Sequence, residues 1–528
     1  MTRRLPRYLA VFLLAVLAAT FSFAEESQPA GFASAAPYMV WATDQPWLKV
    51  MEADEIFDTR YCIGTTPTAD GSPIAAPKGG YWGVRIAGKH DPIKFKAMME
   101  EMIEKKVPGL WIDWHYGDNE EDIFYRMKGL KFLIIECYEP LHAKTFWRLS
   151  AMVNLEVLDI RDWVSNKKEL PEYDLSRLRD MKSLKRLALT SDRVTDGNLG
   201  FVGGLKQLTH LRVHSGKLTN DSFKKIRMMP ELMALDLQGR FNVVDPEIVS
   251  TNPYLKDLSI RSYTTELEFS QEAFKEFLDV NVVSALHLQG FDDNRAEVIA
   301  KENSIVRISI DSSGISNEGF NLLAKLPSLR QLTAKSFKLA GGGVKALGGF
   351  AELRTLKLYP RSISVSASDF EPLAETGKLE SLSVISPDDD TEDLVEGISK
   401  IRTLRKLTLA VPKLDDLAKL SALEKLEVLE VDASKFTSEC YSTIAGLPAL
   451  KTLVLHNCKG TDADIAKLAD LKTLENLTIY KAALSETALS VLAKYPSLKS
   501  LVLVKSGILP GAGRPEELKK LKSYIVRE

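Results

Sequence analysis

Two tryptophans and an aspartate lie close together in the first quarter of the chain. Trp111, Asp113 and Trp114 fall within one short segment, and the acids Glu136 and Asp159 follow. Aromatic faces can stack on a sugar ring, while carboxylates accept hydrogen bonds from its hydroxyl groups. These residues therefore predict a carbohydrate-binding end of the molecule. The alternative is that the tryptophans pack the apolar interior, as large aromatic side chains commonly do.

A second group of side chains is basic and includes one tyrosine. Its members are Arg330, Lys335, Arg354, Lys357 and Tyr359, with Arg405 and Lys406 farther along the chain. Clustered positive charge attracts acidic proteins and anionic polysaccharides, so this group predicts a partner-binding surface. The alternative is a solvated strand face whose charge is balanced by nearby acids such as Asp311.

The patterns that carry enzymatic or metal chemistry are missing from the sequence. It contains no GxSxG, HExxH or phosphate-binding loop. His210, His214 and His287 are spaced too far apart along extended strands to share a metal ion. Residues 387–393 are acidic but lack the glycine and the distal glutamate of an EF-hand calcium loop. We therefore expect no enzymatic activity, no cofactor and no metal.

Four cysteines are too few for a scaffold built on disulfides. Cys440 and Cys458 could form one disulfide, and Cys62 could pair with Cys137. The alternative is that the cysteines remain thiols. No CxxC spacing is present, which argues against a structural zinc site.

An internal repeat contains the strands and helices that must position these side chains. The pattern L-x-x-L-x-L, with other aliphatic residues in some copies, recurs seventeen times, for example at 184–189, 208–213 and 498–503. Its central residue advances from Leu110 to Leu501 in sixteen steps, or about 24 residues per step. A period of this length indicates a solenoid in which each repeat packs on its neighbours.

The second half of each repeat predicts a short helix. A hydroxyl residue followed by an acid or amide recurs there, as in Thr195-Asp196, Ser316-Asn317 and Thr461-Asp462. Ser and Thr are favoured helix N-caps, and acids are favourable in the first turn. Apolar residues spaced by three then mark one helix face. The two shortest repeats, which end at the strands around Ile308 and Leu429, predict 3₁₀ turns instead.

Seventeen in-frame copies of this pattern resemble the leucine-rich repeat family, of the helix-bearing, ribonuclease-inhibitor-like kind found among exported bacterial proteins. The resemblance covers residues 107–505. It implies an α/β solenoid, a curved horseshoe of about 17 strand-turn-helix repeats whose parallel strands line the concave face. It also implies a protein-binding scaffold that acts through this face. The asparagine that the family often places at position 9 of the repeat is absent from all seventeen copies.

The remaining segments predict a leader, a lead-in and two caps. Residues 1–24 have the basic start, apolar stretch and small residues of a signal peptide cleaved after Ala24. Residues 25–80 have no period and predict a loosely ordered lead-in. Residues 81–106, with a strand at 81–86 and a helix from Asp91-Pro92 to Lys106, predict an N-terminal cap. Residues 506–528 predict a C-terminal cap with a helix at 515–522 and a strand at 524–526.

Composition supports this interpretation and narrows the functional classes. The 528 residues carry 69 Lys plus Arg against 71 Asp plus Glu, which argues against a dedicated nucleic-acid binder. After residue 24 no apolar run is long enough to span a bilayer. We therefore predict a secreted, periplasmic or cell-surface scaffold that binds a protein partner. The alternative function is binding of a carbohydrate or cell-envelope polysaccharide at the tryptophan-rich end, and no pattern specifies an oligomeric state.

Overall fold

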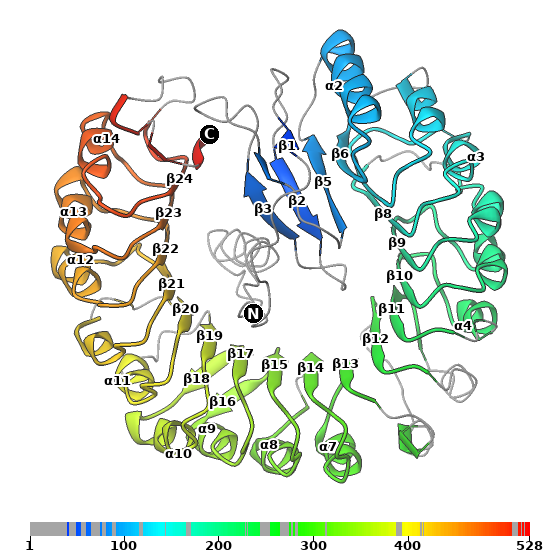
Figure 1. Cartoon of the computed structure of the whole chain (residues 1–528). Helices are drawn as coiled ribbons and strands as arrows, with labels where there is room; N and C mark the ends of the chain where they lie inside the picture. The colour runs from blue at the N-terminus through cyan, green and yellow to red at the C-terminus, as the bar shows by residue number, and fades with distance from the viewer. Residues whose placement is uncertain are drawn as a thin grey trace, which may run out of the picture. The chain divides into compact units, whose positions relative to one another are not determined.

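The structure is a computed structural model in which strands alternate with helical segments along the chain (Figure 1). Two compact units divide the chain, residues 1–283 (unit 1) and residues 284–528 (unit 2). The structure describes residues 40–41, 49–53, 60–64, 74–75, 81–86, 91–115, 120–142, 144–164, 171–227, 229, 231–242, 254–263, 274–275, 278–279, 283–311, 314–386, 393–411, 414, 417–508, 516–518, 520–521 and 523–527. The predicted signal peptide with Ala24, and most of the acidic segment 387–393, lie outside these residues.

Unit 1 contains a sheet whose parallel strands follow one another in chain order. They are β5 (Tyr81–Ile86), β6 (Gly109–Trp114), β7 (Phe132–Cys137), β8 (Val157–Asp162), β9 (Arg186–Thr190), β10 (His210–His214), β11 (Ala234–Gly239) and β12 (Asp257–Ser262). The helical segments between them, with 3₁₀ helices written η, are α2 (Pro92–Glu104), η1 (Glu120–Arg126), α3 (Thr145–Leu149), η2 (Ser176–Asp180), η3 (Asn198–Gly204) and α4 (Asp221–Ile226).

Unit 2 repeats the same arrangement. Its parallel strands are β13 (Ala285–Gln289), β14 (Arg307–Asp311), β15 (Gln331–Lys335), β17 (Thr355–Tyr359), β19 (Ser381–Ile385), β20 (Lys406–Ala410), β21 (Val428–Asp432), β22 (Thr452–His456), β23 (Asn476–Tyr480), β24 (Ser500–Val504) and β25 (Ser523–Arg527). Between them lie α7 (Asp293–Ile299), α8 (Asn317–Leu323), α9 (Gly341–Leu347), η4 (Ala367–Phe370), α10 (Glu371–Glu375), α11 (Leu394–Ser399), η5 (Ala418–Ala422), α12 (Ser438–Ala445), α13 (Asp462–Lys467), η6 (Leu468–Asp470) and α14 (Thr487–Leu492).

All seventeen strands predicted from the repeat are present, from β6 to β24, once the short pair β16 (Lys338–Ala340) and β18 (Ser362–Ser364) is set aside. In each unit the strands lie on one side of the stack and the helical segments on the other (Figure 1). This is the leucine-rich repeat fold that the sequence predicted. Each repeat has only one apolar side. The repeats stack because each buries this side against the repeats before and after it.

The strand register places equivalent residues of successive repeats side by side. Leu187, Leu211 and Leu235 are register partners on three consecutive strands, and all three are buried. Full burial of a leucine side chain contributes roughly 2 kcal/mol. Since side chains alternate along a strand, the residues between the leucines face away from the helical segments. We call that side of each sheet the open face.

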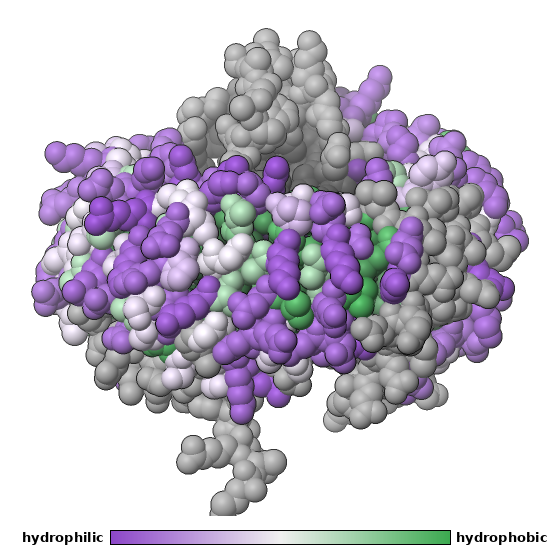
Figure 2. Space-filling model, turned by 90° about the horizontal axis from the view of Figure 1, so that it is seen from below, coloured by the Kyte–Doolittle hydropathy of each residue, from purple (hydrophilic) through white to green (hydrophobic). Residues whose placement is uncertain are grey.

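The opposite, helix-bearing side is turned toward solvent. Over the helical segments of unit 2, hydrophilic residues cover most of the surface, with smaller apolar areas between them (Figure 2).

The sequence predicts a 3₁₀ turn in each of the two shortest repeats, and η5 confirms this in one of them. In the other repeat the prediction is wrong, because Asp292 caps α7 by accepting a hydrogen bond from Arg295 N at 3.0 Å. An N-cap directly after the strand leaves room for a complete helix.

The start of unit 1 is more regular than the sequence predicted. The strand β5 and the helix α2 lie where a strand and a helix were expected, and Asp91 caps α2 by accepting hydrogen bonds from the backbone of Ile93 and Lys94. Strand β2 (Lys49–Ala53) then pairs antiparallel with β5, and β3 (Arg60–Gly64) pairs with β2. A second antiparallel pair joins β1 (Val40–Trp41) to β4 (Ile74–Ala75). The sheet of unit 1 therefore extends into the predicted lead-in.

The end of unit 2 contains the predicted closing strand. Strand β25 pairs in parallel with β24, and its described bounds exceed the expected 524–526 by one residue at each end. Of the helix expected at 515–522, the structure describes η7 (Glu516–Leu518). None of the helices in the described parts of the chain is both long and apolar enough to cross a bilayer.

Acids at the start of the helical segments join neighbouring repeats. Asp196 accepts hydrogen bonds from Thr219 N at 3.0 Å and from Thr219 Oγ1 at 2.6 Å. Asp293 binds Ser316, and Asp462 binds Ser485, in the same way. Each acid therefore satisfies the helix start of the following repeat, where backbone N–H groups lack partners within the helix. These contacts join the repeats in a chain that lacks the asparagine often found at position 9 of a leucine-rich repeat.

Asp462 offers a direct test of this link. Substitution to Ala removes its bonds to Ser485 and to Thr487 Oγ1, which lies at 2.6 Å. We expect the free energy of unfolding to fall by about 1–2 kcal/mol, measured by urea denaturation. The control is Asp470→Ala, because Asp470 is exposed in the same repeat. Equal losses in the two variants would show that the inter-repeat bonds contribute nothing.

Candidate functional site

The predicted basic residues occupy two different places in unit 2. Lys335, Lys357 and Tyr359 lie on the open face, on β15 and β17, and the Lys335 ammonium is 5.6 Å from the centre of the Tyr359 ring. Burial, together with the charges of Lys406 and Lys335, lowers the pKa of Lys357. Three lysines therefore lie close enough to repel one another. We call Lys335, Lys357 and Lys406 the lysine patch.

The predicted arginines lie apart from this patch, at the turns that lead into the strands. Arg330 directly precedes β15 and Arg354 directly precedes β17, and both side chains are exposed. Arg354 Nη1 lies 2.8 Å from Glu380 Oε1. Exposed pairs of this kind contribute little to stability or to specificity. The structure therefore brings together Lys335, Lys357 and Tyr359 of the predicted group, and it separates the two arginines from them.

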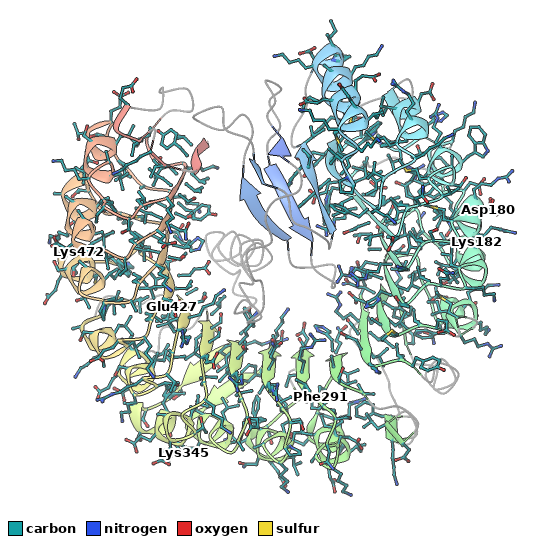
Figure 3. The ribbon with its side chains drawn as sticks, viewed as in Figure 1. Asp180, Lys182, Phe291, Lys345, Glu427 and Lys472 are labelled. Carbon is teal, nitrogen blue, oxygen red and sulfur yellow. The ribbon has the colours of Figure 1, made fainter. Side chains whose placement is uncertain are left out.

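The turns that lead into the strands form one rim of unit 2, and opposite charges alternate along this rim. Arg405 Nη1 is 2.6 Å from Glu427 Oε1, and Lys451 Nζ is 2.8 Å from the other oxygen of the same carboxylate. Glu427 lies on the strand side of the unit, whereas Lys345 and Lys472 lie on the helix side (Figure 3). Because the rim acids neutralise the rim cations, this row is not a strong site for an anionic partner.

Sequence reasoning missed Ser383, which belongs to the patch. Ser383 on β19 is the register partner of Lys357 on β17, so the two side chains stand side by side on the open face. The next strands continue the row with Thr408 and Glu430. Aligning the repeats by register rather than by charge would have revealed this row from the sequence. The site is therefore a lysine beside a line of hydroxyl groups, not only a set of cations.

The buried acid of this row is bound to a histidine of the next strand. Glu430 and His456 are 7% and 2% exposed, and Glu430 Oε1 lies 2.8 Å from His456 Nε2. Thr408 Oγ1 donates to the other carboxylate oxygen at 3.4 Å. The His456 ring stacks on Tyr480 with centroids 4.8 Å apart and a 5° interplanar angle. Glu430 is therefore already engaged by His456 and Thr408.

The positive charges on the open face of unit 1 belong to arginines that are paired with carboxylates. Arg85 lies 3.3 Å from Asp113 and 3.8 Å from Glu136, while Arg161 lies 3.4 Å from Glu136 and 2.7 Å from Asp159. The guanidinium groups of β5 and β8 thus flank the carboxylates of β6 and β7. Their charges are therefore compensated within the sheet itself.

Asp236 is the centre of a second paired group on this face. Arg212 Nε, His214 Nε2 and Arg261 Nη2 lie 2.9, 3.1 and 3.1 Å from its carboxylate. Burial acts to raise the pKa of Asp236, yet the hydrogen bond and charge of His214 with the charges of Arg261 and Arg212 hold it well below its usual value. The carboxylate therefore remains ionised and holds two arginines from β10 and β12 together.

The structure does not bring Trp111, Asp113 and Trp114 to a common exposed surface. Trp114 is 0% exposed and packs against Phe95 and Phe124, with ring centroids at 6.2 and 5.5 Å. The prediction that Trp114 stacks on a sugar is therefore wrong, because side chains alternate along β6 and Trp114 lies on the core side with Leu110 and Ile112.

Trp111 and Asp113 do face the open side, but each is only 8% exposed. The Arg85 guanidinium lies 3.7 Å above the Trp111 ring and also binds Asp113. Trp111 further packs against Phe132 and Ile134 in one apolar cluster. Arg85 thus occupies the stacking face and the carboxylate that were expected to bind a sugar.

Cys440 and Cys458 are not joined by a disulfide. Both are buried in the repeats around α12 and β22, and Cys458 Sγ lies 3.3 Å from Tyr441 Oη. Burial raises the pKa of the Cys458 thiol, although hydrogen bonds from Tyr441 and from the Gly460 backbone oppose this. The two cysteines therefore remain thiols, the alternative to pairing, and each fills its own place in the core.

No group of three or more His, Cys, Asp or Glu side chains in the described ranges is arranged to hold a metal ion. The three histidines considered earlier lie on different strands, His210 and His214 on β10 and His287 on β13. His214 is committed to Asp236. Burial, reinforced by the charge of Arg186, lowers the pKa of His210 to about 4.

Several solved structures resemble this chain in fold. A leucine-rich repeat protein of Leptospira interrogans aligns with 16% identity and a TM-score of 0.37 over 71% of this chain and 91% of its own. The internalin InlF of Listeria monocytogenes aligns with 14% identity and a TM-score of 0.31 over 77% and 92%. TLR13, in a complex with ssRNA13, aligns with 16% identity and a TM-score of 0.39 over 91% and 68%.

The fold of this chain rests on its own repeats of strand, turn and helix. No protein-family model matches the chain. No curated protein matches its sequence significantly.

Asp236→Asn tests whether the paired charges stabilise unit 1. The amide leaves Arg212 and Arg261 without their shared anion, so we expect the free energy of unfolding to fall by about 2 kcal/mol. Urea denaturation measures this loss, which should shrink at high salt because the arginines then repel each other less. The control is Asp180→Asn, an exposed residue on the helix side (Figure 3). A loss no larger than that of the control would contradict the role of Asp236.

His210 predicts a specific dependence of stability on pH. Its pKa in the folded chain is about 4, below the usual 6.5, so the unfolded state binds this proton more readily. Stability should therefore fall as the pH drops from 6.5 toward 4. Between pH 7 and pH 5 we expect His210→Gln to lose roughly 1 kcal/mol less than wild type, allowing for partial exposure. Denaturation at both pH values measures the difference, and parallel losses would contradict the shift.

Proposed function

We propose that the chain is an exported, non-enzymatic scaffold that binds an acidic protein partner through the open face of unit 2. The observation that supports this proposal is the lysine patch. Lys335, Lys357 and Lys406 stand on β15, β17 and β20, and burial together with the charges of Lys406 and Lys335 lowers the pKa of Lys357. Like charges held together destabilise a free protein and become favourable once an anionic partner neutralises them.

The contrast between the two open faces strengthens this argument. In unit 1, Arg85 and Arg161 share carboxylates from adjacent strands. In unit 2, the carboxylate of Glu430 is bound to His456 instead of to a lysine. Lys335 stands beside its register partner Asp311, so in the described part of this face the positive area that lacks an acid is the one around Lys357. Such an area increases the rate at which acidic partners associate and selects against basic ones.

The shape of the fold also suits protein binding. A preformed sheet face can contribute the roughly 800 Å² per partner of a standard interface without ordering a flexible segment.

Export is part of the proposal because residues 1–24 have the pattern of a signal peptide. The carbohydrate alternative has weaker support, because Arg85 covers Trp111 and Trp114 is part of the core.

The test uses a reversal of charge within the patch. The purified chain is immobilised and exposed to the secreted and envelope proteins of the cells that produce it. We expect Lys335→Glu with Lys357→Glu to weaken capture of a saturable partner by at least about tenfold and to flatten its salt dependence, because two attractive charges become repulsive.

The matched control reverses two exposed turn lysines in the same unit, Lys425→Glu with Lys472→Glu. It makes the same change in net charge away from the open face. If both double variants captured the partner as well as wild type, or lost it equally, the assignment of the binding face would be wrong.

A further inference from the structure

Within the described residues, a cation without an ion-pair partner and a buried hydroxyl without a hydrogen bond stand side by side on the open face of unit 2. One is the ammonium of Lys357 on β17, and the other is the hydroxyl of Ser383, its register partner on β19. Both side chains stand on the open face of unit 2, since the burial of β17 alternates and Leu356 and Leu358 point into the core. The two groups are therefore adjacent and face the same way.

Lys357 carries a positive charge that no described residue balances. Neither a hydrogen bond nor an ion pair joins its ammonium to another side chain in the described part of the chain. The side chain is half-buried, and the charges facing it from β15 and β20 are those of Lys335 and Lys406. A desolvated ammonium beside two others is unfavourable unless an anion completes the site.

The hydroxyl of Ser383 is a neutral group that also lacks a partner in the described ranges. Its side chain is only 5% exposed, and its Oγ makes no hydrogen bond of normal length and angle within the described residues, although a weaker contact with the Tyr359 phenol acts to lower the pKa of that phenol. A buried hydroxyl without a partner destabilises a fold by about 1–3 kcal/mol. Most buried polar side chains are satisfied, so an exception beside an unpaired lysine points to a missing ligand.

Tyr359 closes one side of this position. Burial raises the pKa of its phenol, the neighbouring Ser383 hydroxyl acts in the opposite direction, and the charge of Glu430 raises the pKa further. The phenol therefore stays protonated at neutral pH and can donate a hydrogen bond. Lys357, Ser383 and Tyr359 together present an ammonium and two hydroxyl groups, all of which are donors.

We propose that Lys357 and Ser383 form an oxyanion-binding site in which the ammonium and the hydroxyl donate to one carboxylate of an acidic segment of the partner. This rests on the proposed function, because it names the chemical group that the open face of unit 2 recognises. A carboxylate suits the site because charge-assisted hydrogen bonds from both donors can reach its two oxygens. The flanking charges of Lys335 and Lys406 favour a segment with several acids over a single one.

The experiment measures binding of small probes to the purified full chain by calorimetry at constant ionic strength. The probes are a hexaglutamate peptide and inorganic sulfate. We expect wild type to bind the peptide saturably, and Lys357→Met and Ser383→Ala to weaken that binding by about tenfold or more. Lys472→Met is the control, which removes the same charge from the helix side (Figure 3).

The two probes separate the possible sources of the anion. Binding of the peptide alone identifies an acidic protein segment as the ligand. Binding of sulfate with the same dependence on Lys357 and Ser383 would support the oxyanion site but would overturn its restriction to protein carboxylates. If neither probe bound, or if both variants bound as wild type does, the site would be refuted.

A second measurement excludes a purely structural explanation. Without any anion, Ser383→Ala and Lys357→Met should unfold at the same temperature as wild type or higher, because each removes an unsatisfied group. Lower melting temperatures in both variants would show that these side chains support the fold, and would contradict the proposal.

The outcomes also distinguish this site from the proposed function. If the peptide binds as expected but no protein is captured through the patch, the site stands and the scaffold function fails. If a partner is captured through Lys335 and Lys357 while Ser383→Ala has no effect on peptide binding, the function stands and the oxyanion site fails.

Discussion

Burial of the repeated leucines between neighbouring repeats is the interaction on which the rest of this structure depends. A single strand-turn-helix repeat has one apolar side and cannot bury it alone. Stacking in register buries residues such as Leu187, Leu211 and Leu235 in continuous columns. The same register fixes the intervening residues in rows on the open face, so that Lys357, Ser383, Thr408 and Glu430 become neighbours although each comes from a different repeat.

Strand spacing then determines how the charges of a row must be satisfied. Paired strands lie about 4.8 Å apart, so a charged side chain meets its partner on the next strand or has none nearby. In unit 1 the partners are present, and Asp236 holds Arg212 and Arg261. At the helix starts Asp196 and Asp462 bind the following repeat in the same manner. Lys357 departs from this rule, because its neighbours on the adjacent strands are Thr333 and Ser383, and the proposed binding site rests on this departure.

The sequence predicted the strands well because a strict period of aliphatic residues has only one packing solution. It predicted the site less well, because the repeat pattern assigns a residue to a strand but does not specify which side chains from other elements pack against it. Trp114 was expected on the open face, although alternation along β6 places it with Leu110 and Ile112 in the interior, where it packs against Phe95. Arg85 comes from before the first clear repeat, so nothing in the pattern placed it over Trp111. Cys440 and Cys458 share one region but fill separate places in the core.

A solenoid can tolerate an unfavourable site better than a globular domain of the same size can. Its stability is approximately a sum of terms from each repeat and its neighbours. The cost of an unpaired Lys357 and a buried Ser383 hydroxyl therefore falls on the repeats around β17 and β19, where Leu356 and Leu382 keep the core columns intact. Because the leucines that hold the sheet lie on the face opposite to these polar groups, the residues that bind can depart from the most stable choice without disturbing the residues that fold.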